Sequence, residues 1–152
     1  KKTKLSFFVP KNKWQELVWR VAFGSSIFPA NGVDKLKIMA KDPRYEFYLI
    51  TGRFGFLDKH IFGWLKNNHL EGAFKKVCIN NKTEQPHLFK ERIIDNLKLD
   101  YFVEDNLDVV MYLENKVKTK VLWIYNILDR TKNYQLKFPY LGKALDEIAL
   151  LD

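Results

Sequence analysis

The residues best suited to chemistry are two adjacent carboxylates, Glu104 and Asp105, which follow the apolar run 101–103 and precede Asn106. Neighbouring carboxylates repel each other, and burying one without a partner is costly. A divalent cation would compensate this charge, and Mg²⁺ prefers carboxylate and water oxygens and often bridges to phosphate. This interpretation makes Asp105 a metal ligand, with Glu104 or Asn106 in contact directly or through water. The structural alternative is that Asp105 or Asn106 caps a helix starting at Leu107.

Two further positions have side chains that suit an anionic ligand. The hydroxyl of Thr51 and the amide of Gly52 can donate hydrogen bonds to phosphoryl oxygens, and glycine permits a close approach. Arg53 can add a guanidinium, and Lys90 can supply a fixed positive charge that offsets a phosphate in the transition state. Each position also has a plain structural explanation, namely a capping threonine in a strand-to-helix turn, a surface arginine and a solvated helix lysine.

Apolar runs alternate with amphipathic stretches along the chain, and this alternation predicts the elements that position these residues. We expect helices over 14–22, 33–40, 58–68, 88–97 and 107–115, and strands over 46–51, 75–80, 101–103 and 120–126. Strands separated by helices of this length imply parallel pairing with helices on both faces, which is a three-layer α/β fold. Ligands bind such a fold outside the carboxyl ends of the strands, where Asn80 and Asn126 would join the residues named above.

Composition narrows the classes of protein to consider. A length of 152 residues fits one domain, and no apolar run reaches the roughly 20 residues that span a bilayer, so we expect a cytoplasmic protein that does not contact a membrane. The net charge is +8, but the lysines are scattered, so we do not expect nucleic-acid binding. The single cysteine, Cys78, can form no internal disulfide and has no partners for a zinc site.

Three segments together resemble the haloacid-dehalogenase-like phosphohydrolases. "FYLITGR" at 47–53, Lys90 at the opening of a helix, and "LDYFVEDN" at 99–106 look like motifs two, three and four of that family, in the right order. The segment 121–134, "VLWIYNILDRTKNY", is similar to its nucleotidase-like branch. The resemblance covers about 28–148 and implies a Rossmann-like domain with Thr51, Lys90 and Asp105 as catalytic residues and Mg²⁺ as cofactor.

The family's first motif, a strand ending in Asp-x-Asp whose first aspartate attacks phosphorus, is missing from this sequence. Before Thr51 the only aspartates are Asp34 and Asp42, and neither ends an apolar strand. We therefore expect a cap-like helical segment over 1–30 and a core over 31–152 that lacks its first strand. Either another N-terminal segment or a partner chain supplies that strand, or the nucleophile has been lost.

The expected function is that of a phosphohydrolase acting on a phosphorylated small molecule, inactive as this chain alone because the nucleophile is missing. Whether the protein is an enzyme at all stays open at this point. The alternative is a non-catalytic domain that binds a phosphorylated ligand or a protein partner at the same edge of the sheet.

Overall fold

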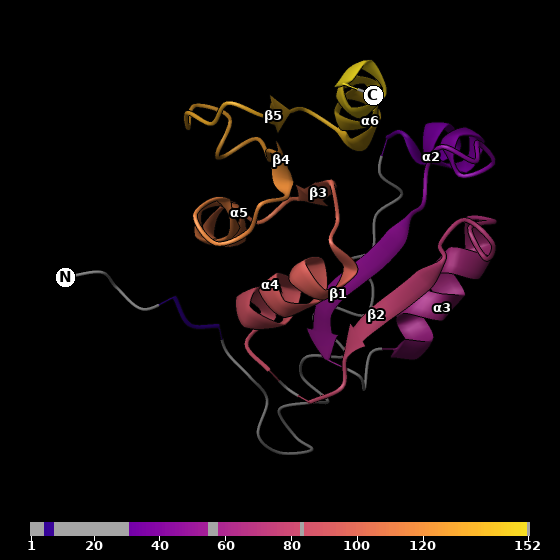
Figure 1. Ribbon diagram of the computed structural model, residues 1–152, viewed down its shortest axis with the longest axis horizontal. Helices are drawn as coiled ribbons and strands as arrows, with labels where there is room; N and C mark the ends of the chain where they lie inside the picture. The colour runs from indigo at the N-terminus through magenta and orange to yellow at the C-terminus, as the bar shows by residue number, and fades with distance from the viewer. Residues whose placement is uncertain (1–4, 8–30, 55–57, 83, 152) are drawn as a thin grey trace.

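The computed structural model describes residues 5–7, 31–54, 58–82 and 84–151 (Figure 1). In chain order the described elements are α2 (Val33–Met39), β1 (Tyr48–Phe54), α3 (Asp58–Asn67), β2 (Lys76–Asn80), α4 (Pro86–Leu97), β3 (Tyr101–Glu104), α5 (Leu107–Glu114), β4 (Lys120–Ile124), β5 (Lys137–Phe138) and α6 (Leu141–Leu151). The chain is therefore a mixed α/β protein, as predicted. The helix expected over 14–22 lies outside the described residues.

All strand pairs in the described chain are parallel, which confirms the predicted pairing. β1 pairs with β2 in one sheet, and β3, β4 and β5 follow one another in a second sheet. A single continuous sheet was expected, whereas no ladder joins the two sheets within the residues described here. Because the strands of each sheet are parallel, their carboxyl ends lie at one edge of that sheet, next to the start of the following helix.

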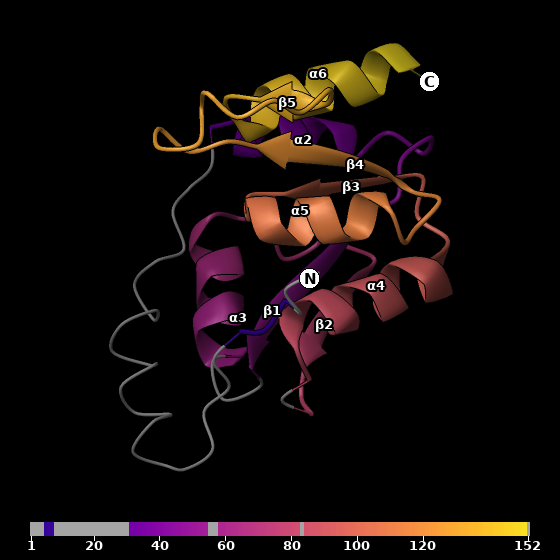
Figure 2. The ribbon, with the colours of Figure 1, turned by 90° about the vertical axis from the view of Figure 1, so that its left-hand side faces the viewer.

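Helices cover both faces of these strands. Figures 1 and 2 show α4 and α5 on one side of the strands, and α2, α3 and α6 on the other. Between the strands and α3 lies the α3-side core, and between the strands and α5 lies the α5-side core. The buried members of the α3-side core are Leu36, Met39, Ile61, Leu65, Leu70, Leu122, Ala144, Leu145 and Ile148. Those of the α5-side core are Ile94, Phe102, Val109, Val110, Leu113, Val121 and Trp123.

The two sheets contribute to the same two cores. Successive residues of β1 alternate, with Leu49 packed on the α3-side core and Ile50 on the α5-side core. In β3, Phe102 belongs to the α5-side core and Val103 packs on the α3-side core. This alternation follows from the two-residue period of a strand. It shows that β1 and β3 present their faces to the same pair of helix layers.

Element boundaries differ from the prediction in two places that concern the candidate site. Strand β1 continues to Phe54, so Gly52 and Arg53 lie within the strand and do not follow it. Helix α4 begins at Pro86, which suits a first helical position because proline has no N–H to leave unpaired. Lys90 is therefore in the second turn of α4, and the prediction that it opens the helix was wrong.

Strand β5 and helix α6 were not predicted. Helix α6 packs against α2, where Gly32 has a φ of 117° and a Cβ built on it would lie 2.2 Å from the backbone nitrogen of Gly142. Only glycine tolerates both the left-handed conformation and this contact. Among the helices that the structure describes, none combines the length and hydrophobicity needed to cross a membrane.

Candidate functional site

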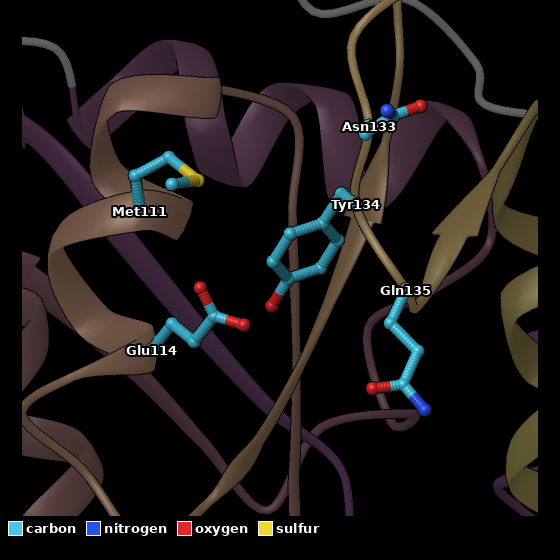
Figure 3. A pocket seen from close by; sticks show the side chains of 5 residues that line it. All are labelled: Met111, Glu114, Asn133, Tyr134 and Gln135. Carbon is cyan, nitrogen blue, oxygen red and sulfur yellow. The ribbon is translucent and has the colours of Figure 1, made fainter.

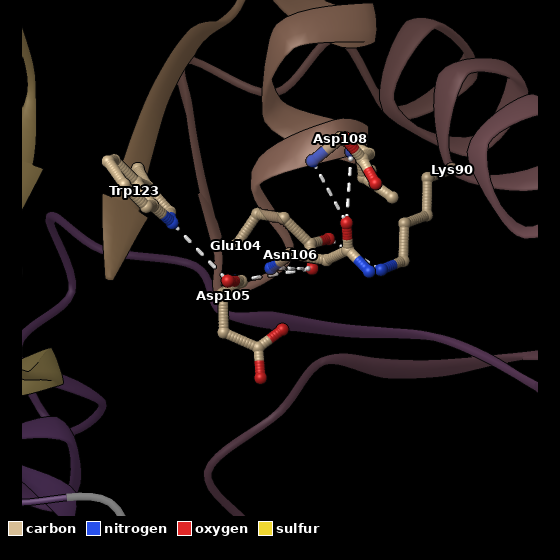
Figure 4. Close-up of polar contacts among 7 residues, drawn as sticks. Lys90, Glu104, Asp105, Asn106, Asp108 and Trp123 are labelled. Atoms are coloured by element: carbon tan, nitrogen blue, oxygen red, sulfur yellow. Dashed lines mark hydrogen bonds and ion pairs between the residues drawn. The ribbon is translucent and has the colours of Figure 1, made fainter. Parts of the chain in front are cut away.

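The centre of the candidate site is an ion pair between helix α4 and the end of strand β3. The Nζ atom of Lys90 lies 2.5 Å from Oε2 of Glu104, and the two side chains are only 13% and 4% exposed (Figure 4). Burial raises the pKa of Glu104, the nearby Lys90 partly opposes this, and the charge of Asp105 raises the pKa further. Lys90 thus compensates the charge of Glu104, a role for which the sequence suggested a divalent metal ion.

The second oxygen of Glu104 organises the turn into α5. Oε1 accepts hydrogen bonds from the backbone N–H groups of Asp105, at 3.2 Å, and of Asn106, at 3.1 Å. The two carboxylate oxygens of Glu104 therefore have different partners. Oε2 contacts the ammonium of Lys90, and Oε1 accepts from the backbone of the following turn. The sequence alone gave Glu104 a secondary role, but the structure makes it the carboxylate that fixes Lys90.

Asn106 is the N-cap of α5. Its Oδ1 accepts hydrogen bonds from the N–H groups of Asp108, at 3.0 Å, and Val109, at 3.3 Å. This is the helix-cap alternative considered for the acidic segment, and it accounts for the amide in Glu104-Asp105-Asn106. Asp105 is exposed, and Figure 4 shows its carboxylate pointing away from the Lys90–Glu104 pair.

The end of β1 lies against the beginning of α4. A Cβ built on Gly52 would lie 2.8 Å from Cβ of Pro86 and 3.5 Å from Cε of Lys90. The structure therefore brings together Gly52, Lys90 and Glu104, which come from three separate segments of the sequence. Pro86 was not predicted to take part, although a proline at a helix start is a recognisable signal.

Thr51 and Arg53 are placed differently from Gly52. Because Ile50 and Gly52 both face α4, the alternation of β1 puts the Thr51 side chain on the opposite face of the strand. The backbone of Arg53 belongs to β1, but its side chain lies outside the described part of the structure. Of the residues predicted to bind phosphate, Gly52 and Lys90 are neighbours.

The asparagines at the other strand ends, Asn80 and Asn126, form hydrogen bonds within the turns that follow them. Asn80, only 1% exposed, accepts from the N–H of Glu84 at 3.1 Å and donates to the carbonyl of Glu84 at 2.5 Å. Asn126 accepts from the N–H groups of Leu128 and Asp129 and donates to the Asp129 carboxylate at 2.9 Å. Both side chains therefore stabilise loops after strands.

The side chains at this site do not form a complete Mg²⁺ site on their own. Over the described ranges, no three His, Cys, Asp or Glu side chains gather closely enough to hold a metal ion. Glu104 does not fit the predicted role of ligand, because Lys90 already compensates its charge. Asp105 remains as one exposed carboxylate, whereas Mg²⁺ needs six oxygen ligands, which water and phosphate commonly complete.

A shallow surface hollow lies away from this ion pair, between α5 and the segment before β5. Figure 3 shows its lining by Met111, Glu114, Asn133, Tyr134 and Gln135. The Tyr134 hydroxyl donates a 2.9 Å hydrogen bond to the carbonyl of Val121, at the start of β4. Burial, and then the charge of Glu114, raises the pKa of Tyr134 to about 12, so this hydroxyl stays protonated and structural.

Comparison of the chain with models of protein families, with curated proteins and with solved structures finds no match.

Proposed function

We propose that the chain is a haloacid-dehalogenase-like α/β domain that binds a phosphate monoester beside Lys90. The observation that carries this proposal is that Lys90 is held by Glu104 and packed next to Gly52, so three of the segments resembling the family meet at one place. A lysine ammonium held in a fixed position beside the end of a strand is suited to a phosphoryl oxygen. Glu104 acts as a positioning residue, because it orients Lys90.

The fold in this proposal is three-layered and Rossmann-like, with the first strand supplied by another N-terminal segment or by a partner chain. Two features support it. The β1–β2 and β3–β4–β5 sheets share both cores, and no described strand pairs with the outer edges of β1 and β3. A parallel strand between β1 and β3 would join the two sheets and place its carboxyl end beside Lys90. A strand ending in Asp-x-Asp would then bring the nucleophile to the phosphate.

The residues of this chain would then divide the work as follows. The ammonium of Lys90 neutralises charge on the phosphoryl group, and Gly52 lets β1 pack closely against the start of α4, the helix that carries Lys90. Asp105 would offer an exposed carboxylate to a magnesium ion, whose chemistry when bound would be to offset phosphate charge. Because the sequence has no Asp-x-Asp, the chain alone has no group to form an aspartyl-phosphate, and we expect it to be inactive.

The experiment measures binding of inorganic phosphate, and separately of a nucleoside monophosphate, to the full chain by isothermal titration with and without Mg²⁺. A charge-assisted hydrogen bond contributes about 1.5–3 kcal/mol, so Lys90→Met should weaken phosphate binding about 10- to 150-fold. Lys118→Met removes an exposed lysine and is the matched control, with unchanged affinity expected. Equal affinity of the two variants, or no phosphate binding by the wild type, would exclude the site.

A phosphatase assay with phosphate monoesters and Mg²⁺ tests the expected inactivity. Turnover near about one per second by the chain alone would show that the nucleophile is not needed from outside.

The second candidate, a non-catalytic domain that binds a phosphorylated ligand, is favoured by the lack of an Asp-x-Asp motif in the sequence. The two candidates differ once an apolar strand ending in Asp-x-Asp is fused ahead of Lys1. The enzyme hypothesis expects turnover in that fusion, and Lys90→Met in the same fusion should abolish it. Phosphate binding without turnover in the fusion would favour the binding domain.

A further inference from the structure

Residues 5–7 attach to the beginning of α4 through their backbone. The N–H of Phe7 donates to Oε1 of Gln85 at 2.7 Å, and Nε2 of Gln85 donates back to the carbonyl of Phe7 at 3.0 Å. The side-chain amide of Gln85 thus satisfies both backbone polar groups of Phe7, which lies 78 positions away, as a neighbouring strand would do. Gln85 is the N-cap residue of α4, but its side chain makes no capping hydrogen bond, so it serves this contact instead.

The ring of Phe7 extends the attachment into an aromatic group on α4 and α5. Its centroid lies 5.7 Å from the imidazole of His87, and His87 meets the ring of Tyr112 edge to face at 4.6 Å. Phe7 and Tyr112 also pack on the α5-side core. Such aromatic pairs contribute roughly 0.5–1.5 kcal/mol each beyond the area they bury. His87 therefore links residues 5–7 to α4 and α5, in addition to the hydrogen bonds with Gln85.

His87 lies in an environment suited only to its neutral form. The residue is 5% exposed, and its Nδ1 is buried without a hydrogen-bond partner among the described residues. Protonation makes both ring nitrogens donors, so an imidazolium here would be left with an unsatisfied N–H and a poorly solvated charge. Burial lowers the pKa of His87, and the charge of Glu91 opposes this less strongly.

The charged and titratable groups around His87 do not remove this cost. On its own helix the relevant group is Glu91, whose Oε2 already accepts a 2.5 Å hydrogen bond from the Tyr112 hydroxyl. On α5, Tyr112 faces His87 with its ring, and Nζ of Lys116 lies 5.9 Å from the centroid of that ring. The segment 5–7 contributes no ionisable side chain. The Glu91 carboxylate therefore already has the Tyr112 hydroxyl as a partner, and the Lys116 ammonium lies near the Tyr112 ring.

We propose that residues 5–7 form a pH-sensitive latch, which stays docked on α4 while His87 is neutral and is released when His87 is protonated. Release would free the backbone of Phe7 from Gln85 and expose the first turn of the helix that carries Lys90. The latch involves residues 5–7 and would operate whether or not the site binds phosphate.

The test follows the amide of Phe7 in the full chain by hydrogen exchange measured with NMR and corrected for the intrinsic effect of pH. Between about pH 7.5 and pH 5 we expect its protection factor to fall by up to about 30-fold, the limit that protonation of one histidine with an ordinary pKa of 6.5 can supply at pH 5. The ring protons of His87 should titrate below the ordinary histidine pKa of 6.5. Constant protection of Phe7, or titration of His87 at or above its ordinary pKa of 6.5, would overturn the latch.

Three variants separate the latch from general acid sensitivity. His87→Phe keeps an aromatic ring but cannot be protonated, so protection of Phe7 should stay constant between the two pH values. His60→Phe is the matched control on α3 and should behave as the wild type. Gln85→Leu removes both backbone hydrogen bonds and should abolish protection at both pH values. Loss of protection on acidification in His87→Phe, as in the wild type, would contradict the proposal even if another variant failed to fold.

Discussion

Among the ion pairs found between described residues, the pair of Lys90 and Glu104 is the most buried. Removing ions from water costs several kcal/mol each, and their attraction offsets this only with good geometry and further hydrogen bonds. Glu104 meets both conditions, because it contacts Lys90 at 2.5 Å and accepts from two backbone N–H groups. A buried ion pair of this kind contributes little net stability, so it is better explained by the fixed position that it gives to Lys90.

Lys90→Met should therefore destabilise the protein in a pH-dependent way. At pH 7 it leaves the Glu104 carboxylate buried without its cation, and we expect a loss of about 3–5 kcal/mol in the free energy of unfolding. The folded-state pKa of Glu104 is raised above its ordinary value of 4.5, and losing Lys90 raises it further. A raised pKa means that Glu104 binds its proton more tightly in the folded protein than in the unfolded chain. The stability that this contributes is fully present below the pKa of Glu104 in the unfolded chain, and it is lost as pH rises through its pKa in the folded protein.

The measurement is urea unfolding of wild type, Lys90→Met and Lys118→Met at about pH 7 and about pH 4.5. The loss in Lys90→Met should be smaller at the lower pH, and the exposed control should stay within about 0.5 kcal/mol of wild type at both. An equal loss at both pH values would show that Glu104 is not the group left uncompensated.

At the scale of elements, the site depends on how closely strand β1 approaches helix α4. Gly52 permits this approach, because a side chain there would meet Cβ of Pro86 at 2.8 Å. Pro86 is part of the first turn of α4 and cannot rotate away, so α4 or β1 would have to shift. That shift would also move Lys90, which lies one turn further along the same helix.

Gly52→Ala and Gly63→Ala make a matched pair for this contact. Overpacking typically costs about 1–3 kcal/mol, so Gly52→Ala should lower the free energy of unfolding by that amount and weaken phosphate binding. Gly63 is an exposed position in α3 with no atom within 4 Å of a built Cβ. Alanine there should stabilise the protein by about 0.5–1 kcal/mol, because glycine is unfavourable in a helix. Thermal unfolding of both variants checks this, and a neutral Gly52→Ala would mean that the contact is loose.

Sequence patterns predicted the elements that carry strong periodicity. The helix expected over 58–68 is observed as Asp58–Asn67, and the strand expected over 75–80 is observed as Lys76–Asn80. Strand β5 has two residues, too few for any period, and it forms through long-range pairing with β4. Helix α6 did carry a helical signal, with its buried residues Ala144, Leu145 and Ile148 spaced by one and three positions.

The candidate site was only partly predictable for a similar reason. Residues 14 positions apart, such as Lys90 and Glu104, leave no local pattern that says they touch. The sequence indicated that a buried carboxylate needs a positive partner, but it could not say whether that partner is a metal ion or a lysine. The cap at Asn106 was readable, since it depends only on the two or three residues that follow.

At the scale of the whole molecule, the shared cores should make the two sheets unfold together. Leu122 of β4 is fully buried in the α3-side core, which also contains Leu65 of α3, the helix that follows β1. Leu122→Ala should lower the free energy of unfolding by about 2–5 kcal/mol, because it leaves a cavity. If the core couples the sheets, hydrogen exchange should accelerate in β1 and β2 as well as in β3 and β4.

Leu128→Ala is the control, because it removes the same atoms from a side chain that is 85% exposed, and it should change neither the free energy of unfolding nor the exchange rates. Faster exchange confined to β3 and β4 would instead mean that the two sheets unfold as independent units.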